Sequence, residues 1–392
     1  MKMKKILAAI TAWILLASML LCVAVNAETE NISQNEEAYP DLGLTCKSAV
    51  LMEASSGEIL YAHNPDEALP PASVTKVMTL LLVMEAIDGG MLKYTDTVTA
   101  SANAASMGGS QIYLKEGETM TVEDLLKSVV IASANDAAVA LAEHIAGSES
   151  AFVAKMNARA GELGMKSTNF ENTNGLDDTV TDHVTSARDI AIMSRELIKH
   201  RKILEYSSIW MDTIRNGSFG LTNTNRLVRF YNGATGLKTG STSKAKFCIS
   251  ATACRDGMDL ICVIMGAESR DVRNEEAKKL LDWGYANYEL FKCPGDTVRG
   301  VRVIGGTEST ADASYGDFTL VVKKGESAKI KKSLEMTDGL TAPVKRGDRV
   351  GRVVFEINGK VMGSIDILSE NDVKKIAFGE LLERIFAFFF MK

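Results

Sequence analysis

The chain carries the stretch Pro70-Pro-Ala-Ser-Val-Thr-Lys76, which joins a strand-like run to an apolar segment of helical periodicity. Paired prolines stop a strand, because proline cannot donate a backbone hydrogen bond to a sheet. Ser73 and Lys76 are three residues apart, so on a helix their side chains share one face. We therefore predict a helix that begins near Ser73 and brings the lysine amine within reach of the serine hydroxyl.

A serine beside a lysine is a candidate nucleophile with its base. Lys76 can accept the serine proton only when it is neutral, so its pKa must be lowered by burial and by a neighbouring positive charge. Lys238, in a later segment, is the neighbour that we expect. The spacing alone has low specificity, because Ser241 and Lys244 repeat it in a region where a strand is expected.

Two further segments complete the set in chain order. Ser133-Ala-Asn135 interrupts an apolar helical stretch, and Lys238-Thr-Gly240 occurs once, among glycines that allow a ligand to approach the backbone closely. A phosphate-binding loop is excluded, because the glycine–lysine order of such loops is absent and a strand is expected to follow. The three segments supply a nucleophile, a base, a proton-relaying hydroxyl and a cationic clamp for a carboxylate. That inventory fits acyl transfer through a serine ester.

The three segments resemble the SxxK, SxN and KTG motifs of the penicillin-binding proteins and serine β-lactamases. The closer resemblance is to the low-molecular-mass D-alanyl-D-alanine carboxypeptidases, a family with a β-rich second domain and a C-terminal amphipathic anchor. It extends over residues 42–288 and rests on the segments 71–79, 132–137, 236–242, 263–266 and 273–281.

The resemblance implies a reaction. Ser73 would attack the carbonyl between the last two D-alanines of a peptidoglycan stem peptide, Lys76 would take its proton, and water would hydrolyse the acyl-enzyme. β-Lactams would acylate the same serine as substrate mimics. The residues that the resemblance implies are Ser73, Lys76 and Ser133 for catalysis, and Asn135, Lys238, Thr239, Gly240, Ser241 and Arg273 for substrate binding.

The resemblance also implies a role for each group. Ser133 would relay a proton to the leaving amine, and Asn135 would hold the substrate amide. Lys238 and Thr239 would bind the terminal carboxylate, with Arg273 as a helper. The backbone N–H groups of Ser73 and Ser241 would form the oxyanion hole.

The chain departs from the family pattern in three places. The second motif reads SAN, where this family often has SGN and class A β-lactamases have SDN. The motif ExxLN is not found after Ser133, since residues 171–174 read ENTN, so the fast deacylation of a class A β-lactamase is not assigned. The family arginine upstream of the KTG aligns equally with Arg226 and Arg229, and neither is chosen.

The order of elements predicts an α/β (α+β) fold. Strand-like runs near the start and after residue 232 enclose several helical segments, which suggests one antiparallel sheet flanked by helices with an inserted helical lobe. Asp256-Gly257 between two apolar runs is a strong hairpin signal. The expected strands are 47–53, 58–63, 237–241, 245–253 and 260–266, and the expected helices are 73–87, 121–145, 150–163, 186–200 and 275–291.

The N-terminal residues have the features of a secretory signal peptide. Three lysines within residues 1–5 precede an apolar run over 6–25, and small residues follow at Val25-Asn26-Ala27. A retained membrane anchor is the alternative. We expect an exported protein at the outer face of the cytoplasmic membrane.

The C-terminal residues 373–391 place apolar side chains at helical spacing and end in the apolar run Ile385-Phe-Ala-Phe-Phe-Phe-Met391. The segment is shorter than the roughly 20 residues that span a bilayer. An amphipathic helix lying on the membrane surface fits it better. Docking on the protein's own core is the alternative.

These patterns predict how the chain is divided into domains and terminal segments. A signal peptide (1–27) and a flexible leader (28–41) precede a catalytic domain (42–292), and a small all-β domain (293–368) and an amphipathic membrane-anchoring helix (369–392) follow it.

Charge and composition exclude other classes. The net charge is −6, and removal of residues 1–27 with their three lysines leaves 41 basic against 50 acidic residues, or −9, which argues against a nucleic-acid partner. The four histidines are scattered and no CxxC or HExxH occurs, so we expect neither a metal nor another cofactor. The five cysteines after residue 27 are predicted to be buried free thiols.

Two other functions stay open. A relative could use the same acyl-serine as a D,D-endopeptidase, a β-lactamase or an esterase. A non-catalytic protein could bind the wall or sense β-lactams without turnover. Release of D-alanine separates these from a carboxypeptidase.

Overall fold

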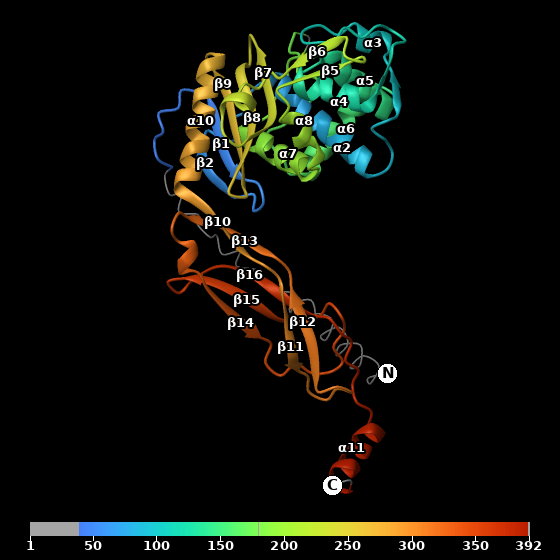
Figure 1. Ribbon diagram of the computed structural model, residues 1–392, viewed down its shortest axis with the longest axis vertical. Helices are drawn as coiled ribbons and strands as arrows, with labels where there is room; N and C mark the ends of the chain where they lie inside the picture. Colours follow the sequence, from blue (N-terminus) through green and yellow to red (C-terminus); the bar gives the residue numbers. More distant parts are fainter. Residues whose placement is uncertain (1–38, 179, 391–392) are drawn as a thin grey trace, which may run out of the picture. The chain divides into compact units, whose positions relative to one another are not determined.

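The structure is a computed structural model that describes residues 39–178 and 180–390 (Figure 1). The predicted signal peptide and most of the predicted leader lie outside the described residues. Contacts gather the chain from Leu42 onward into one unit.

A five-stranded antiparallel sheet lies at the centre of the first part of this unit, in the order β2-β1-β9-β8-β7. It unites strands from distant segments, as predicted. Asp256 and Gly257 both take positive φ at the turn between β8 and β9, which is the backbone that a tight hairpin requires. The strands are β1 (Ser48–Glu53), β2 (Ile59–His63), β7 (Ala234–Thr242), β8 (Lys246–Arg255) and β9 (Met258–Ala267).

Helices cover both faces of this sheet. One apolar core joins the face that carries Val50 and Val263 to the inserted helical lobe, and a second joins Leu51 and Leu260 to Leu281 of α10 on the other face. Figure 1 shows the lobe and α10 on opposite sides of the sheet. The lobe contains α2 (Lys76–Asp88), α3 (Ala102–Ala105), α4 (Val122–Ile131), α5 (Asn135–Ala146), α6 (Glu149–Glu162), α7 (Ala187–Lys199) and α8 (Lys202–Ser207). It also contains two antiparallel strand pairs, β3 (Thr97–Thr99) with β4 (Thr119–Thr121) and β5 (Met211–Ile214) with β6 (Phe219–Thr222).

The helix boundaries follow local signals. The hydroxyl of Ser186 accepts the backbone N–H of Asp189 at 3.2 Å and so caps α7, at the start of the helix expected over 186–200. The long helical stretch from residue 121 is interrupted at Ser133, and α4 and α5 lie on either side of the break.

The helix predicted at 275–291 is shifted. α10 spans Arg270–Asn287, because the hydroxyl of Ser269 caps it by accepting the N–H of Val272 at 3.1 Å. It ends where Tyr288 begins strand β10 (Tyr288–Cys293), which pairs with the distant β13 (Phe318–Lys323). The shift places Arg273 in the first turn of the helix.

The segment after α10 is all-β, as predicted. A five-stranded sheet in the order β11-β12-β16-β15-β14 encloses a core around Val353 and Phe355. The rings of Phe318 and Phe355 stack with centroids 4.3 Å apart, which joins the β10–β13 ribbon to this core. The strands are β11 (Asp296–Arg302), β12 (Thr310–Tyr315), β14 (Lys331–Met336), β15 (Arg349–Ile357) and β16 (Lys360–Ser369).

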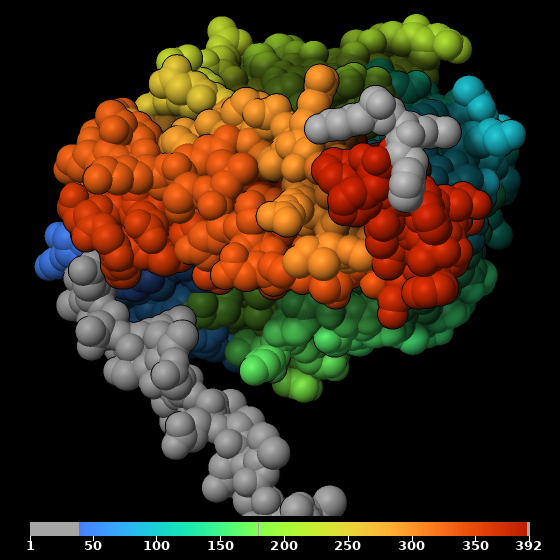
Figure 2. Space-filling view, turned by 90° about the horizontal axis from the view of Figure 1, so that it is seen from below, coloured from blue at the N-terminus to red at the C-terminus, as the bar shows by residue number. Residues whose placement is uncertain are grey.

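The C-terminal helix α11 spans Phe378–Phe390 and does not begin at Val373 as the periodicity suggested. Val373 is buried in the β-sheet core and exchanges two backbone hydrogen bonds with Val344, at 2.9 and 2.8 Å, so it cannot enter the helix. Every side chain from Phe378 to Phe389 is exposed, and the helix is part of the red C-terminal surface in Figure 2. Within residues 39–178 and 180–390, no helix has both the length and the apolar character for a membrane crossing.

Candidate active site

The candidate nucleophile lies in a strained turn. Ser73 belongs to the 3₁₀ turn Ala72–Thr75, directly before α2. Ala72 has φ +49°, a left-handed conformation that is rare for a residue with a side chain. Such strain persists at functional sites where the surroundings hold it in place. Gly175 contributes to these surroundings, since a Cβ there would meet the carbonyl oxygen of Ala72 at 1.8 Å.

Lys76 contacts the serine as predicted. Its Nζ lies 2.8 Å from Oγ of Ser73 and 2.7 Å from the carbonyl oxygen of Asn174, to which it donates. The side chain is fully buried. Burial is the main cause that lowers the pKa of Lys76 well below its usual value, and the positive charge of Lys238 lowers it further. The negative charge of Asp136 acts in the opposite direction. A neutral amine at this place can accept the proton of Ser73.

A buried histidine supports the turn from behind. Nδ1 of His183 accepts the N–H of Glu171 at 3.0 Å, so Nε2 carries the proton and donates to Oγ1 of Thr75 at 2.7 Å. The Thr75 hydroxyl in turn donates to the carbonyl of Ala72 at 2.8 Å. Burial lowers the pKa of His183 to about 4, so the ring is neutral at pH 7 and holds the nucleophile turn without adding charge.

The second motif lies between two helices. Ser133 takes φ +64° and is 4% exposed, with its side chain in the pocket. Nδ2 of Asn135 donates to the carbonyl of Gly108 at 2.7 Å, while its buried Oδ1 has no partner in the described part of the chain. An unpaired buried acceptor is costly. The Asp136 carboxylate accepts backbone N–H groups of Ile112 and Leu114, which fixes the loop after Gly108.

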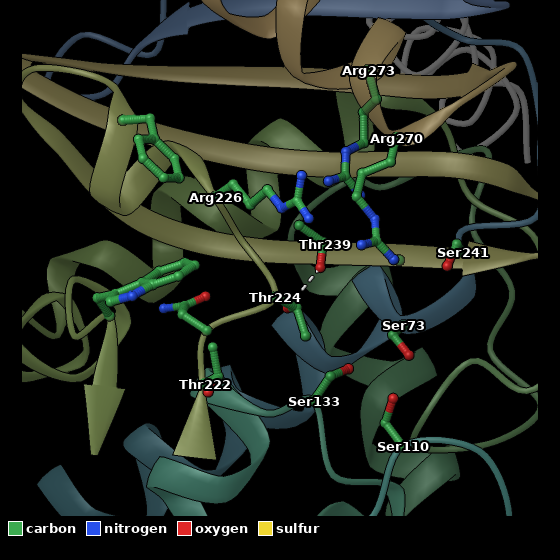
Figure 3. Close-up of a pocket in the computed structure, with 14 residues that line it drawn as sticks. Ser73, Ser110, Ser133, Thr222, Thr224, Arg226, Thr239, Ser241, Arg270 and Arg273 are labelled. Atoms are coloured by element: carbon green, nitrogen blue, oxygen red, sulfur yellow. Dashed lines mark hydrogen bonds between the residues drawn. The ribbon is translucent and has the colours of Figure 1, made fainter. Parts of the chain in front are cut away.

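The third motif lies on β7. Lys238 is 1% exposed, and burial, with the charge of Arg273, lowers its pKa to about 7. The Thr239 hydroxyl donates to Oγ1 of Thr224 at 2.7 Å, the dashed line in Figure 3. A Cβ on Gly240 would meet the backbone N of Ser73 at 2.8 Å. This glycine therefore lets strand β7 lie against the turn that carries Ser73. At Gly240 the close approach is made by the protein's own backbone and not by a ligand.

A pocket of about 620 Å³ opens in front of these motifs (Figure 3). Six predicted residues line it, and the other three, Lys76, Asn135 and Lys238, lie buried behind it. The predicted residues that line the pocket are Ser73, Ser133, Thr239, Gly240, Ser241 and Arg273.

Several pocket residues escaped the sequence reasoning. Arg226, and not Arg229, lines the pocket, and the guanidinium of Arg229 lies over the ring of Trp210 at 5.5 Å. Arg270 could have been found three residues before Arg273, but the predicted helix began too late to place the two on one face. The further lining residues are Ser110, Trp210, Thr222, Asn223, Thr224 and Phe230.

Arg273 is held by the protein and is 3% exposed. Its Nε and Nη2 donate to Oδ1 of Asn274 at 3.2 and 2.9 Å, and Nη1 donates to the carbonyl of Cys248 at 3.4 Å. Burial lowers its pKa to about 10, with further contributions from the charges of Arg270 and Arg226.

The cysteines lie away from this chemistry. All five described cysteines are free thiols, as predicted, and four are buried. Cys254 is half-buried, which differs from the prediction, because β8 ends beside it at the hairpin.

Comparison with known proteins places the chain in a defined context. A family model described as D-alanyl-D-alanine carboxypeptidase matches residues 33–269, and one described as the C-terminal domain of penicillin-binding protein 5 matches residues 286–375. The D-alanyl-D-alanine carboxypeptidase DacF of Bacillus subtilis is 42% identical over 379 residues, which cover 95% of this chain and 96% of that protein.

Solved structures agree with the sequence relatives. Penicillin-binding protein 5 from Haemophilus influenzae superimposes with a TM-score of 0.75 at 35% identity, over 85% of this chain and 98% of that one. Penicillin-binding protein D2 from Listeria monocytogenes, in its ampicillin-bound form, gives a TM-score of 0.58 at 32% identity, over 63% of this chain and all of that one.

Proposed function

The chain belongs to the D-alanyl-D-alanine carboxypeptidase family, and we propose that Ser73 is the nucleophile of its reaction. The protein is a serine-type peptidase of the penicillin-binding group that acts on the cell wall. Its substrate is a peptidoglycan stem peptide ending in D-Ala-D-Ala, from which it removes the last residue.

Acylation begins at Lys76. Its neutral amine takes the proton of Ser73, and Oγ forms a bond to the carbonyl carbon between the two D-alanines. Backbone N–H groups of Ser73 and Ser241 bind the oxyanion. The carbon–nitrogen bond then breaks, and Ser133 relays to the leaving amine the proton that Lys76 took from Ser73. Water hydrolyses the ester and regenerates the serine.

Substrate binding uses the other motif residues. Asn135, whose Oδ1 has no partner among the described residues, accepts the N–H of the substrate amide. Thr239 and Arg273 bind the terminal carboxylate in the field of Lys238, and Gly240 keeps β7 against the nucleophile turn. The Lys238 charge thus serves twice, because it attracts the carboxylate and lowers the pKa of Lys76.

One observation carries this proposal: a fully buried lysine with a lowered pKa lies 2.8 Å from a serine hydroxyl at the floor of a pocket. Neutral lysine bases in such surroundings activate nucleophiles. β-Lactams are covalent inhibitors that acylate the same serine, as the ampicillin-bound relative suggests.

The test is D-alanine release from a stem pentapeptide by the full chain. Release that vanishes in Ser73→Ala supports both the reaction and the nucleophile. Penicillin attachment to Ser73 without any D-alanine release contradicts the carboxypeptidase function and favours an endopeptidase or a sensor.

We also propose the domain division and location predicted above. Residues 42–292 carry the chemistry and residues 293–368 the β-rich domain, and the segment 369–392 attaches the exported protein to the outer face of the cytoplasmic membrane through α11. The exposed phenylalanines of α11, among them Phe378 at 78% and Phe389 at 70%, support this proposal.

A further inference from the structure

The pocket holds more positive charge than one substrate carboxylate requires. Arg226, Arg270 and Arg273 line it, and no aspartate or glutamate stands among its lining residues in the described chain. Figure 3 shows the three guanidinium groups turned toward Thr239, with Arg226 and Arg273 ending beside each other and Arg270 reaching down between Thr239 and Ser241.

The hydrogen-bonding capacity is also in surplus. A guanidinium has five N–H donors, and a carboxylate has about four acceptor positions. Arg273 already donates three times to Asn274 and Cys248. The guanidinium groups of Arg226 and Arg270 make no hydrogen bond or ion pair with the described part of the protein, and both side chains are exposed. A single carboxylate, with about four acceptor positions, cannot satisfy the roughly ten N–H donors of these two groups.

Keeping the three charges together is unfavourable for the protein alone. The positive charges of Arg270 and Arg226 both lower the pKa of Arg273, which shows that they repel it. Like charges that share a site destabilise one another unless an anion binds between them. The cluster is therefore best satisfied by a ligand with more than one negative charge.

The pocket also has room beyond the carboxylate clamp. Trp210 and Phe230 form an edge-to-face pair with centroids 6.1 Å apart, and Phe230 is 63% exposed. Both line the same 620 Å³ pocket as Ser73. The methyl group of a D-alanine fills little of such a space, so a larger leaving residue fits.

We propose that the site binds leaving residues that carry a second carboxylate, which Arg270 binds while Thr239, Arg226 and Arg273 bind the α-carboxylate. This rests on the proposed function and deepens it. The substrates are stem peptides with an acidic D-residue at the end, and cross-links whose leaving amine belongs to a second anionic stem. The same carbon–nitrogen bond breaks, and the leaving amine takes the proton as before.

The experiment compares two leaving residues of nearly the same shape and different charge, D-Gln and D-Glu, with D-Ala as the reference. The full chain is given acyl-D-Ala-D-Ala, acyl-D-Ala-D-Gln and acyl-D-Ala-D-Glu, and kcat/KM is measured for each. Because a hydrogen bond to a charged partner is worth about tenfold or more in binding, D-Glu is expected to leave about tenfold faster than D-Gln. Added salt should reduce this ratio.

Arg270→Gln is expected to bring the D-Glu to D-Gln ratio close to one. Lys278→Gln is the matched control, since it removes one positive charge from the same helix at a residue that pairs with Glu275 outside the pocket. It should preserve the ratio. An unchanged ratio in Arg270→Gln, or a D-Gln substrate cleaved as fast as D-Glu by the unaltered protein, overturns the proposal.

Two further measurements separate the possible failures. Absence of any D-Ala release would refute the proposed function, and this inference with it, whereas D-Ala release without a D-Glu preference refutes the inference alone. A soluble cross-linked stem dimer distinguishes the two kinds of substrate. If the protein cleaves the dimer and Arg270→Gln cleaves it more slowly, cross-links are substrates. If the protein cleaves D-Glu peptides but not the dimer, the substrates are acidic stem ends.

Discussion

Two regions of this protein invert the usual distribution of residues. At the active site two lysines are buried, Lys76 completely and Lys238 with 1% exposure. In α11 the phenylalanines are exposed, with Phe388 at 69% and Phe389 at 70%. Lysine is almost never buried without reason, and a group of exposed phenylalanines marks an interaction surface.

The difference between the regions shows what each inversion achieves. Burial of a lysine changes its chemistry, because it lowers the pKa and frees a lone pair. Exposure of a phenylalanine leaves its chemistry unchanged and leaves apolar surface for another molecule to cover. Disturbing the first region should therefore abolish the reaction, and disturbing the second should leave it intact.

The largest effect is expected for Lys76→Arg. Arginine remains protonated in proteins, so it cannot accept the proton of Ser73. We expect kcat for D-alanine release to fall by about a thousandfold or more. Stopped-flow measurement of penicillin acylation should show a comparable loss. Nearly normal acylation in this variant would exclude Lys76 as the base.

A smaller loss is expected for Lys238→Met. The methionine fills a similar volume but removes the charge that attracts the terminal carboxylate. We expect kcat/KM for peptides with a free carboxylate to fall by about a hundredfold, since losing a charged partner costs about 2–3 kcal/mol. Esters without that carboxylate serve as the control and should lose much less. Equal losses on both substrates would refute the clamp.

The pH profile sharpens the comparison further. Lys76 must be neutral to act as the base. For an ester substrate without a terminal carboxylate, kcat/KM should therefore rise as the pH passes through the lowered pKa of Lys76. In Lys238→Met the pKa of Lys76 should rise, because a repelling charge is gone, and the rising limb should move to higher pH. With carboxylate peptides the unaltered protein should lose kcat/KM again above about pH 7, as Lys238 deprotonates. If the rise in kcat/KM for the ester occurred at the same pH in Lys238→Met as in the unaltered protein, the two lysines would not interact.

The smallest effect is expected for Phe389→Ser in α11. The substitution should weaken binding to vesicles of phosphatidylcholine and phosphatidylglycerol by about fivefold, because one partly immersed ring contributes about 1 kcal/mol. Glu383→Gln on the same helix is the matched control and should not weaken it. D-alanine release from soluble peptides should be unchanged in both. Unaltered vesicle binding after truncation behind Ala377 would show that another segment is the anchor.

The parts of the site that are local in sequence were predictable. Ser73 and Lys76 are separated by less than one helical turn, and Ser186 reveals its helix start by its own side chain. The hairpin at Asp256 was equally visible, since its two strands are neighbours in the chain. In each case the residues that decide the structure lie within a short window.

The remaining features depend on contacts between distant segments. Arg226 and Arg270 meet in the pocket only because α10 packs against the sheet, and the start of α10 is set by Ser269, a cap that the apolar pattern does not reveal. Val373 continued the helical periodicity of α11 but is held by Val344 in the β domain. The role of Gly240 depends on the turn at Ser73, which lies far earlier in the chain.

The most direct test of the central claim is to find which residue forms the acyl-enzyme. The full chain is mixed with ampicillin, digested, and its peptides are mapped by mass. We predict one adduct, on Ser73, that is absent in Ser73→Ala. An adduct on Ser110 or Ser133, which line the same pocket, would contradict the assignment of the nucleophile.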